Sequence, residues 1–429
     1  MSDERFDCII VGGGISGITA AYVLAKAGLE VLVIERGEYC GAKNMTGGRI
    51  YGHSLEKVMP GFAKEAPVER IITKERISLM TDEGLTTVEY GSGATGAPEA
   101  VSYSILRAKF DKWFADKAEE EGAMSICGIK VESLIVRNGK VCGVKAGEDE
   151  MEADVVILAD GVHSFLAQQI GMKKDLTPHQ VAVGAKELIT LGEEKMCDRF
   201  GLEASNGMAW VLVGAPTAGN IGGGFIYTNK DSVSLGIVTT VGDIGYSGVS
   251  TVDMLNNFKD HPAIRPLIAG GKVAEYSAHL VPEGGYNMVP ELYADGVLIV
   301  GDAAGMVINL GYMIRGMDLA VESARLAAET VLYAKRKNDF SKNTLAAYKV
   351  ALEESFVMKD LAHHKHAPKF IENRRLFGKY PLLAEEIMRS FFMVDGSPSK
   401  GIVPKVMPAL TKVGLTELAN DGAQALLSL

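Results

Sequence analysis

Residues 6–35 read FDCIIVGGGISGITAAYVLAKAGLEVLVIE, a pattern typical of a strand, a helix and a second strand joined by short turns. Residues 6–11 and 31–35 are mostly apolar, as parallel strands buried on both faces should be. Between them, residues 15–27 carry small and apolar side chains at helical spacing and stop at Gly28, a residue suited to a helix C-terminus. The chain therefore opens with a β–α–β unit.

A glycine-rich turn, G-x-G-x-x-G, joins the first strand to the helix at residues 12–17. Gly12 permits the tight turn, Gly14 lets the backbone approach a diphosphate, and Gly17 lets the helix pack close to the strand. The diphosphate then meets free N–H groups at the positive end of the helix dipole. Glu35 ends the second strand, where its carboxylate can accept hydrogen bonds from ribose hydroxyls. The unit is predicted to bind a dinucleotide.

Two further acids favour FAD over NAD as that dinucleotide. Asp160 in LADG and Asp302 in IVGDAAG each follow a buried strand, on the ligand side of an open α/β sheet. Asp302 is placed to bind the ribityl hydroxyls of a flavin. The next helix, starting between Gly311 and Gly316, would aim its N–H groups at the N1/O2 edge of the flavin and stabilise the charge of its reduced form.

The motifs together resemble a known family. GGGISG, the Glu35-Arg36 pair, LRAKFDKW from residue 106, ADG and GDAAG are similar to the FAD superfamily of aromatic hydroxylases and geranylgeranyl reductases. Within it, three longer blocks resemble the FixC-type electron transfer flavoprotein–quinone oxidoreductases: GAKNMTGGRIYGHSLE (41–56), YSAHLVPEGGYNMVPEL (276–292) and GDAAGMVINLGYMIRGMDLA (301–320). The resemblance spans nearly the whole chain.

The resemblance implies roles for particular residues. Arg107 matches an arginine that contacts the cofactor, Asp302 an acid that binds the ribityl chain, and residues 46–48 a segment beside the isoalloxazine. No catalytic acid or base and no metal ligand is predicted. The candidate FAD-binding residues are Gly12, Gly14, Ile15, Ser16, Gly17, Glu35, Arg36, Lys43, Thr46, Gly47, Gly48, Arg107, Val131, Asp160, Gly161, Gly301, Asp302, Gly311 and Gly316.

The expected fold is α/β, with a Rossmann-like FAD-binding domain, an inserted β-rich domain and a helical C-terminal region. Residues 71–90 alternate as antiparallel strands do, and Asn138-Gly139 marks a hairpin. The expected divisions are 1–75 with 102–165 and 296–335 for FAD, 76–101 with 166–295 for the β-rich quinone domain, and 336–429 for the helical region.

The resemblance also implies a route for electrons. They would come from an electron transfer flavoprotein of two subunits, pass through a ferredoxin-like partner with a [4Fe–4S] cluster, and reach a menaquinone or ubiquinone through FAD. The larger single-chain relatives carry the cluster on their own C-terminal cysteines, but here no cysteine follows Cys197, so we expect the cluster on a separate polypeptide. In some relatives the assembly is bifurcating, with NADH as donor and ferredoxin as second acceptor.

Other interpretations stay open at this point. A geranylgeranyl-reductase-like enzyme would reduce isoprenoid double bonds, a monooxygenase would couple NAD(P)H oxidation to oxygen, and a redox-silent flavoprotein would serve as a scaffold. Residues 222–224, all glycine, could give room to a quinone ring or only bend a strand. Tyr227, Tyr276 and Tyr312 could bind a quinone carbonyl or lie in the core.

The net charge of −10 argues against a nucleic-acid partner. The N-terminal residues contain no apolar signal segment, which favours a cytoplasmic location. Two apolar patches, residues 387–394 and 401–410, lie amid Lys and Arg. They could enter the inner face of the cytoplasmic membrane, as a peripheral protein does, or pack on the flavin domain or a partner subunit.

Overall fold

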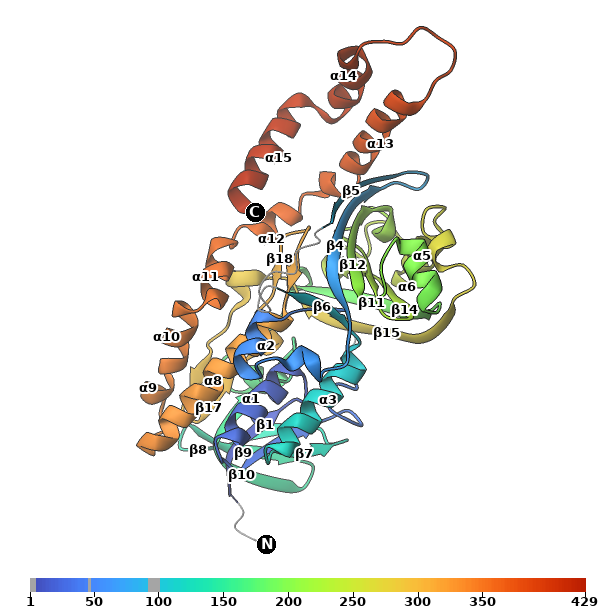
Figure 1. Ribbon diagram of the computed structural model, residues 1–429. Helices are drawn as coiled ribbons and strands as arrows, with labels where there is room; N and C mark the ends of the chain where they lie inside the picture. Colours follow the sequence, from blue (N-terminus) through green and yellow to red (C-terminus); the bar gives the residue numbers. More distant parts are fainter. Residues whose placement is uncertain (1–4, 45–47, 92–100) are drawn as a thin grey trace.

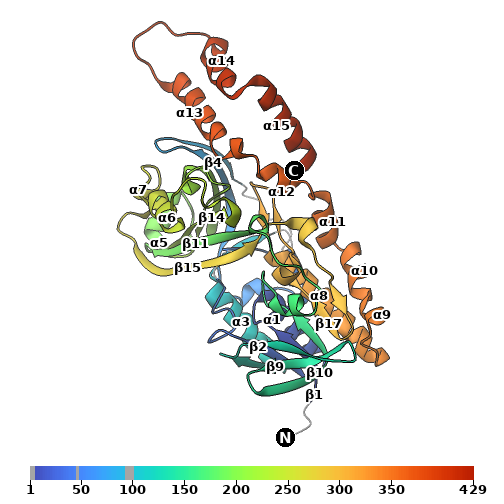
Figure 2. The ribbon, with the colours of Figure 1, turned by 180° about the vertical axis from the view of Figure 1, so that it is seen from behind.

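The computed structural model describes residues 5–44, 48–91 and 101–429 (Figure 1). Figures 1 and 2 show one domain around each of two sheets, with the N-terminus at the far end of the first domain. The C-terminal helices run along one side of the molecule and extend past the second domain. The structure thus has the expected α/β class with a helical C-terminal region.

The first sheet has the strand order β16-β17-β10-β1-β2-β7, and the five strands from β17 to β7 are parallel. The hairpin of β8 and β9, turned at Asn138 and Gly139 as predicted, continues antiparallel from β10. The central strands come from three distant parts of the chain, namely its first 35 residues, residues 124–158 and residues 297–299. The strands are β1 Arg5–Val11, β2 Val31–Glu35, β7 Met124–Cys127, β8 Ser133–Arg137, β9 Lys140–Ala146, β10 Asp149–Leu158, β16 Tyr293–Ala294 and β17 Val297–Ile299.

Three helices cover one face of this sheet: α1 (Ile15–Lys26), α3 (Arg107–Glu120) and α8 (Met317–Lys337). α1 packs against both α3 and α8 and is buried along most of its length. The apolar side of α3 faces inward, with Phe110 and Phe114 fully buried. This packing fixes the start of α1 over the carboxyl ends of β1 and β10.

The second sheet has the order β15-β11-β14-β13-β12-β4-β6-β3, with β5 paired antiparallel to β4 as predicted. Helices α5 (Glu193–Phe200) and α6 (Thr251–Asp260) pack on it. The expected boundary at residue 75 falls within β4, and β3 and β6 join this sheet rather than the first. Its strands are β3 Arg49–Tyr51, β4 Val68–Met80, β5 Leu85–Gly91, β6 Ser102–Ile105, β11 Val181–Thr190, β12 Asn206–Gly214, β13 Gly222–Thr228, β14 Ser232–Thr240 and β15 Lys272–Pro282.

The helical region follows α8, and within it α13 and α14 form a long hairpin from which α15 runs back to the C-terminus (Figure 1). No helix within the described ranges is long and apolar enough to cross a membrane. Shorter elements complete the fold. They are α2 His53–Val58, α4 Phe165–Gln169, α7 Arg265–Ile268, β18 Ile308–Asn309, β19 Ile314–Arg315, α9 Lys342–Leu345, α10 Ala347–Glu354, α11 Phe356–His363, α12 Ala367–Ile371, α13 Lys379–Phe392, α14 Ile402–Val413 and α15 Leu415–Ser428.

Candidate functional site

The glycine-rich turn before α1 leaves the start of that helix open. A Cβ on Gly17 would lie 1.9 Å from the Gly12 carbonyl oxygen, so only glycine permits this close packing. A Cβ on Gly14 would meet only the Asn44 side chain, at 3.4 Å, so the absent side chain leaves space in front of the helix instead. No side chain caps α1 and its first turn contains no acid. Such a helix start suits an anion as large as a diphosphate.

Glu35 is held rigidly at the end of β2. Its two carboxylate oxygens accept hydrogen bonds from the main-chain amides of Gly13, at 2.7 Å, and Gly37, at 2.6 Å. The side chain is buried, yet it also lines the cavity described below. Each carboxylate oxygen can accept more than one hydrogen bond, so Glu35 retains capacity for ribose hydroxyls.

A buried lysine connects the two acid-bearing loops that follow β10 and β17. The Lys173 ammonium donates hydrogen bonds to the carbonyl oxygens of Val162, at 2.6 Å, and Ala303, at 2.8 Å. Burial lowers the pKa of Lys173 to about 8, although the charges of Asp160 and Asp302 oppose this. Lys173 was not predicted as a site residue, since nothing in its local sequence distinguishes it from a surface lysine.

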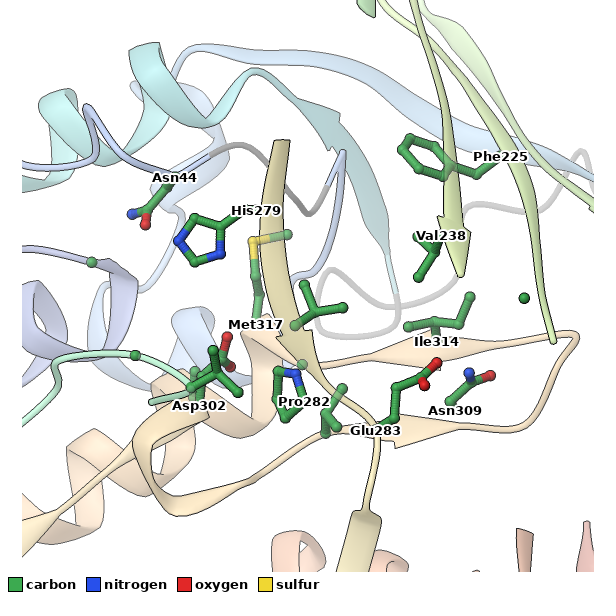
Figure 3. A pocket seen from close by; sticks show the side chains of 18 of the residues that line it. Asn44, Phe225, Val238, His279, Pro282, Glu283, Asp302, Asn309, Ile314 and Met317 are labelled. Carbon is green, nitrogen blue, oxygen red and sulfur yellow. The ribbon is translucent and has the colours of Figure 1, made fainter. Parts of the chain in front are cut away.

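Three basic side chains act on Asp302. Burial raises the pKa of this carboxyl, while Arg107, His279 and Lys173 act in the opposite direction. Arg107 is anchored by Asp111, whose carboxylate accepts from its guanidinium at 2.7 Å. His279 was not predicted, because it arrives from β15 of the other sheet. Figure 3 shows it on the wall of the pocket with Asn44 and Asp302. The positive charges of Arg107 and Lys173 are suited to a diphosphate, and the Asp302 carboxyl is suited to bind hydroxyl groups.

One cavity of about 1310 Å³ joins most of the predicted residues. Fourteen of them line it: Gly12, Gly14, Ile15, Ser16, Glu35, Arg36, Lys43, Arg107, Val131, Asp160, Gly161, Asp302, Gly311 and Gly316. Thr46 and Gly47 lie outside the described residues. Gly17, Gly48 and Gly301 do not line the cavity. They permit close packing behind it, since a Cβ on Gly48 would lie 2.5 Å from the Tyr227 ring and one on Gly301 would lie 2.7 Å from the Ser16 hydroxyl.

The start of α8 forms another part of the wall. Gly316 directly precedes the helix, and no side chain caps the first turn. Gly316, Met317 and Ala320 all line the cavity. An acid in the first turn, Asp318, is buried and paired with Arg315 at 2.6 Å. That acid offsets part of the positive helix end that is predicted to face a flavin.

The cavity continues as an apolar chamber beneath the second sheet. Leu79, Val213 and Val238 line the chamber from the sheet, and residues of α12 and α13, among them Phe370 and Ile387, line it from the helical region. The chamber therefore extends the flavin-sized site toward the C-terminal helices.

At the start of β13, close packing of the neighbouring segments leaves no room for a side chain at residues 222–224. A Cβ on Gly222 would lie 2.0 Å from the Val238 oxygen, and one on Gly223 would lie 2.7 Å from the Leu212 oxygen. These residues still line the chamber through their backbone. Of the three tyrosines considered for a quinone, Tyr227 and Tyr312 line the cavity, whereas Tyr276 does not and is half-exposed on β15.

Comparisons with known proteins agree with this geometry. The family described as FAD dependent oxidoreductase matches residues 7–80, the one described as ETF-QO, ubiquinone-binding, matches 181–281, and the ETF-QO/FixC family C-terminal domain matches 367–429. The probable electron transfer flavoprotein-quinone oxidoreductase YdiS of Escherichia coli is 51% identical over 98% of each chain. The chain belongs to the FixC family of electron transfer flavoprotein–quinone oxidoreductases. As a member of that family, it is a flavin-dependent oxidoreductase, and its cofactor is FAD.

Two further comparisons place this FixC-family chain among its relatives. Protein FixC of Salmonella typhi is 51% identical over 98% of each chain. A geranylgeranyl bacteriochlorophyll reductase-like protein from Thermoplasma acidophilum superposes with a TM-score of 0.74 over 98% of this chain and 99% of its own, at 20% identity. That likeness shows the shared fold alone. The sequence identity favours the FixC-type function over isoprenoid reduction.

Proposed function

We propose that this chain receives electrons from an electron transfer flavoprotein of two subunits and passes them through its FAD to a quinone. The name of the YdiS relative, probable electron transfer flavoprotein-quinone oxidoreductase, supports both ends of the route. Residues 181–281, which match a ubiquinone-binding family, include most of the sheet above the apolar chamber. When bound, FAD supplies the ability to accept and give electrons singly or in pairs.

The proposed position of FAD follows the polar end of the cavity. The diphosphate lies at the open start of α1, with the adenosine ribose at Glu35 and the ribityl chain at Asp302. The Arg107 guanidinium would balance part of the diphosphate charge from the side, and His279 lies on the same wall of the cavity. The isoalloxazine would then lie near the start of α8. The uncapped start of α1 and the basic side chains that act on Asp302 support this arrangement.

The proposed partner between the two flavoproteins is a ferredoxin-like protein with a [4Fe–4S] cluster. The chain's five cysteines are widely spaced and none follows Cys197, whereas such a cluster needs four thiolates in reach of one another. We extend the proposal to a flavin-based bifurcating Fix/Etf assembly, in which oxidation of NADH and reduction of ferredoxin take place on other subunits.

The observation that carries the quinone assignment is the continuity of the cavity. Its polar end contains the dinucleotide-binding turn, and its apolar end reaches Leu383, Ala384 and Ile387 on α13. A quinone in the apolar end would meet the flavin ring without crossing a protein wall. This supports the second sheet as the quinone domain. Electrons pass most readily between groups held in contact in this way.

The test is to reduce the FAD-loaded protein without oxygen, add a soluble quinone and follow the flavin absorbance. Ala384→Trp should slow flavin reoxidation by filling the apolar end, while FAD binding stays unchanged. The neighbouring Leu382→Trp is the matched control, because Leu382 is 60% exposed and does not line the cavity. Flavin that remains reduced in the wild-type protein with excess quinone present would refute the proposal.

We also propose that the end of the α13–α14 hairpin enters a membrane surface. The two apolar patches of the sequence meet there, and Phe392, Val394 and Ile402 are 80%, 91% and 72% exposed. Lys400 lies between the two patches, where it can meet anionic headgroups, and Arg389 on α13 is paired with Glu385 at 3.0 Å. Because α13 also lines the apolar end of the cavity, a lipid-soluble quinone would have a short path from the inner face of the cytoplasmic membrane.

A further inference from the structure

One acid on the wall of the apolar chamber is not among the residues assigned above to FAD. Glu283 directly follows β15 and lines the cavity together with Val238 and Gly222. Figure 3 shows its carboxyl pointing into the pocket on the side of Asn309 and Ile314. It lies just beyond residues 181–281, which match the ubiquinone-binding family.

The surroundings of Glu283 are unusual for a structural glutamate. Its carboxyl accepts one hydrogen bond, from the Thr240 hydroxyl at 2.7 Å, and no ion pair to it occurs among the described residues. Burial raises the pKa of Glu283 to about 7, the charge of Glu372 adds to the increase, and the Thr240 hydrogen bond opposes it. The acid therefore changes its protonation state near neutral pH.

Among the described residues, the charged groups on the elements around Glu283 form no ion pair with its carboxyl. Asp243, in the turn after β14, is already paired with Arg374. His279, on β15 itself, acts on Asp302. Glu372, which follows α12, is exposed to solvent, and its charge acts on Glu283.

From this geometry we propose that Glu283 is the proton donor for the quinone, an inference that rests on the proposed function. Reduction of a quinone to a quinol takes two electrons and two protons. FAD, when bound and reduced to its anionic form, would supply both electrons and one of these protons and return to its oxidised form. The second proton comes from the Glu283 carboxyl, whose O–H bond breaks as the quinol O–H bond forms. The carboxylate keeps the Thr240 hydrogen bond and regains a proton from water.

The main test compares the wild-type holoenzyme with Glu283→Gln. Glutamine keeps the size and can still accept from Thr240, but it carries no transferable proton. The rate of flavin reoxidation by a soluble benzoquinone should fall on the order of 100-fold, the usual contribution of a positioned acid. Reduction of the flavin by dithionite should be unchanged. The wild-type rate should decrease as the pH rises through about 7, whereas the variant rate should not.

Two further variants shift that pH profile in opposite directions. Thr240→Val removes a hydrogen bond that favours the carboxylate, so the midpoint should move to higher pH. Glu372→Gln removes a repelling charge, so the midpoint should move to lower pH. These shifts decide the question even if Glu283→Gln fails to fold.

An infrared titration of the resting holoenzyme gives a readout that does not depend on turnover. The wild-type protein should show the carbonyl stretch of a protonated carboxylic acid that disappears near pH 7, and Glu283→Gln should lack it. The inference would be overturned if Glu283→Gln kept the wild-type rate and pH profile, or if it kept the infrared band of the wild type. It would also be overturned if the midpoint of the pH profile stayed the same in Thr240→Val and Glu372→Gln. Wild-type protein that never reduces quinone would instead overturn the proposed function.

Discussion

Replacing Gly14 by alanine should separate FAD binding from folding. Gly14 precedes α1 in an extended conformation, with φ −83° and ψ 177°, which alanine adopts without strain. The added Cβ would meet nothing in the protein closer than 3.4 Å. It would occupy the space where a diphosphate has to approach the amides of the first helical turn.

The cost can be worked out from those amides. A Cβ needs roughly 3.5–4.0 Å to the nearest heavy atom, whereas a phosphate oxygen bonds an amide nitrogen at about 2.7–2.9 Å, so the phosphate must move away. Hydrogen bonds to a charged group contribute about 1.5–3 kcal/mol each. Loss of two of them amounts to about 3–6 kcal/mol, which corresponds to FAD binding about 10² to 10⁴ times weaker.

The assay is a titration of the apoprotein with FAD, followed by flavin fluorescence, beside thermal unfolding of the apoprotein. Gly17→Ala is the control, since its Cβ would lie 1.9 Å from the Gly12 oxygen and the backbone would have to shift. That variant should unfold at a lower temperature even without FAD. The reasoning is refuted if Gly14→Ala binds FAD within about threefold of the wild-type Kd, or if both variants lose apoprotein stability alike.

Three other outcomes are expected. Because burial lowers the pKa of Lys173 from 10.5 to about 8, the unfolded apoprotein binds more protons between these values. The free energy of unfolding of the wild type should therefore rise by about 3 kcal/mol relative to Lys173→Met from pH 8 to 10.5, as measured by urea titration, and parallel curves would contradict it. Glu35→Gln places an amide N–H2 against a main-chain N–H, so calorimetry should show FAD binding weakened about tenfold or more, and an unchanged Kd would count against the ribose assignment. Phe392→Ser with Val394→Ser should lower binding to anionic vesicles on the order of 100-fold in a sedimentation assay, and Val136→Ser, far from the hairpin, should not. Equal binding of all three proteins would argue against membrane insertion.

The sequence predicts the parts of the site that local structure determines. The turn at residues 12–17 and Glu35 belong to one β–α–β unit, so their spacing alone places them together. Asp160 and Asp302 each follow a buried strand, and parallel neighbouring strands bring their carboxyl ends to one edge of the sheet. These residues accordingly line one cavity.

The remaining parts depend on how the two sheets pack, which no local pattern records. His279 reaches Asp302 only because β15 extends from the second sheet to the first domain. Gly48 is glycine because the Tyr227 ring lies against it, and that contact joins β13 to a segment almost two hundred residues earlier. The boundary expected at residue 75 was misplaced for the same reason, since β4 takes most of its partners from later in the chain.

The raised pKa of Glu283 is a property that comes from this packing and that its local sequence does not predict. A carboxyl whose pKa rises from 4.5 to about 7 on folding makes the folded state less stable above pH 7, by about 3 kcal/mol. A glutamine in its place would accept the same Thr240 hydrogen bond without that cost. A structural role therefore does not account for an acid at this position. A proton donor does account for it, because transfer to a quinone requires a group that can lose and regain a proton near neutral pH in a chamber lined largely by apolar side chains.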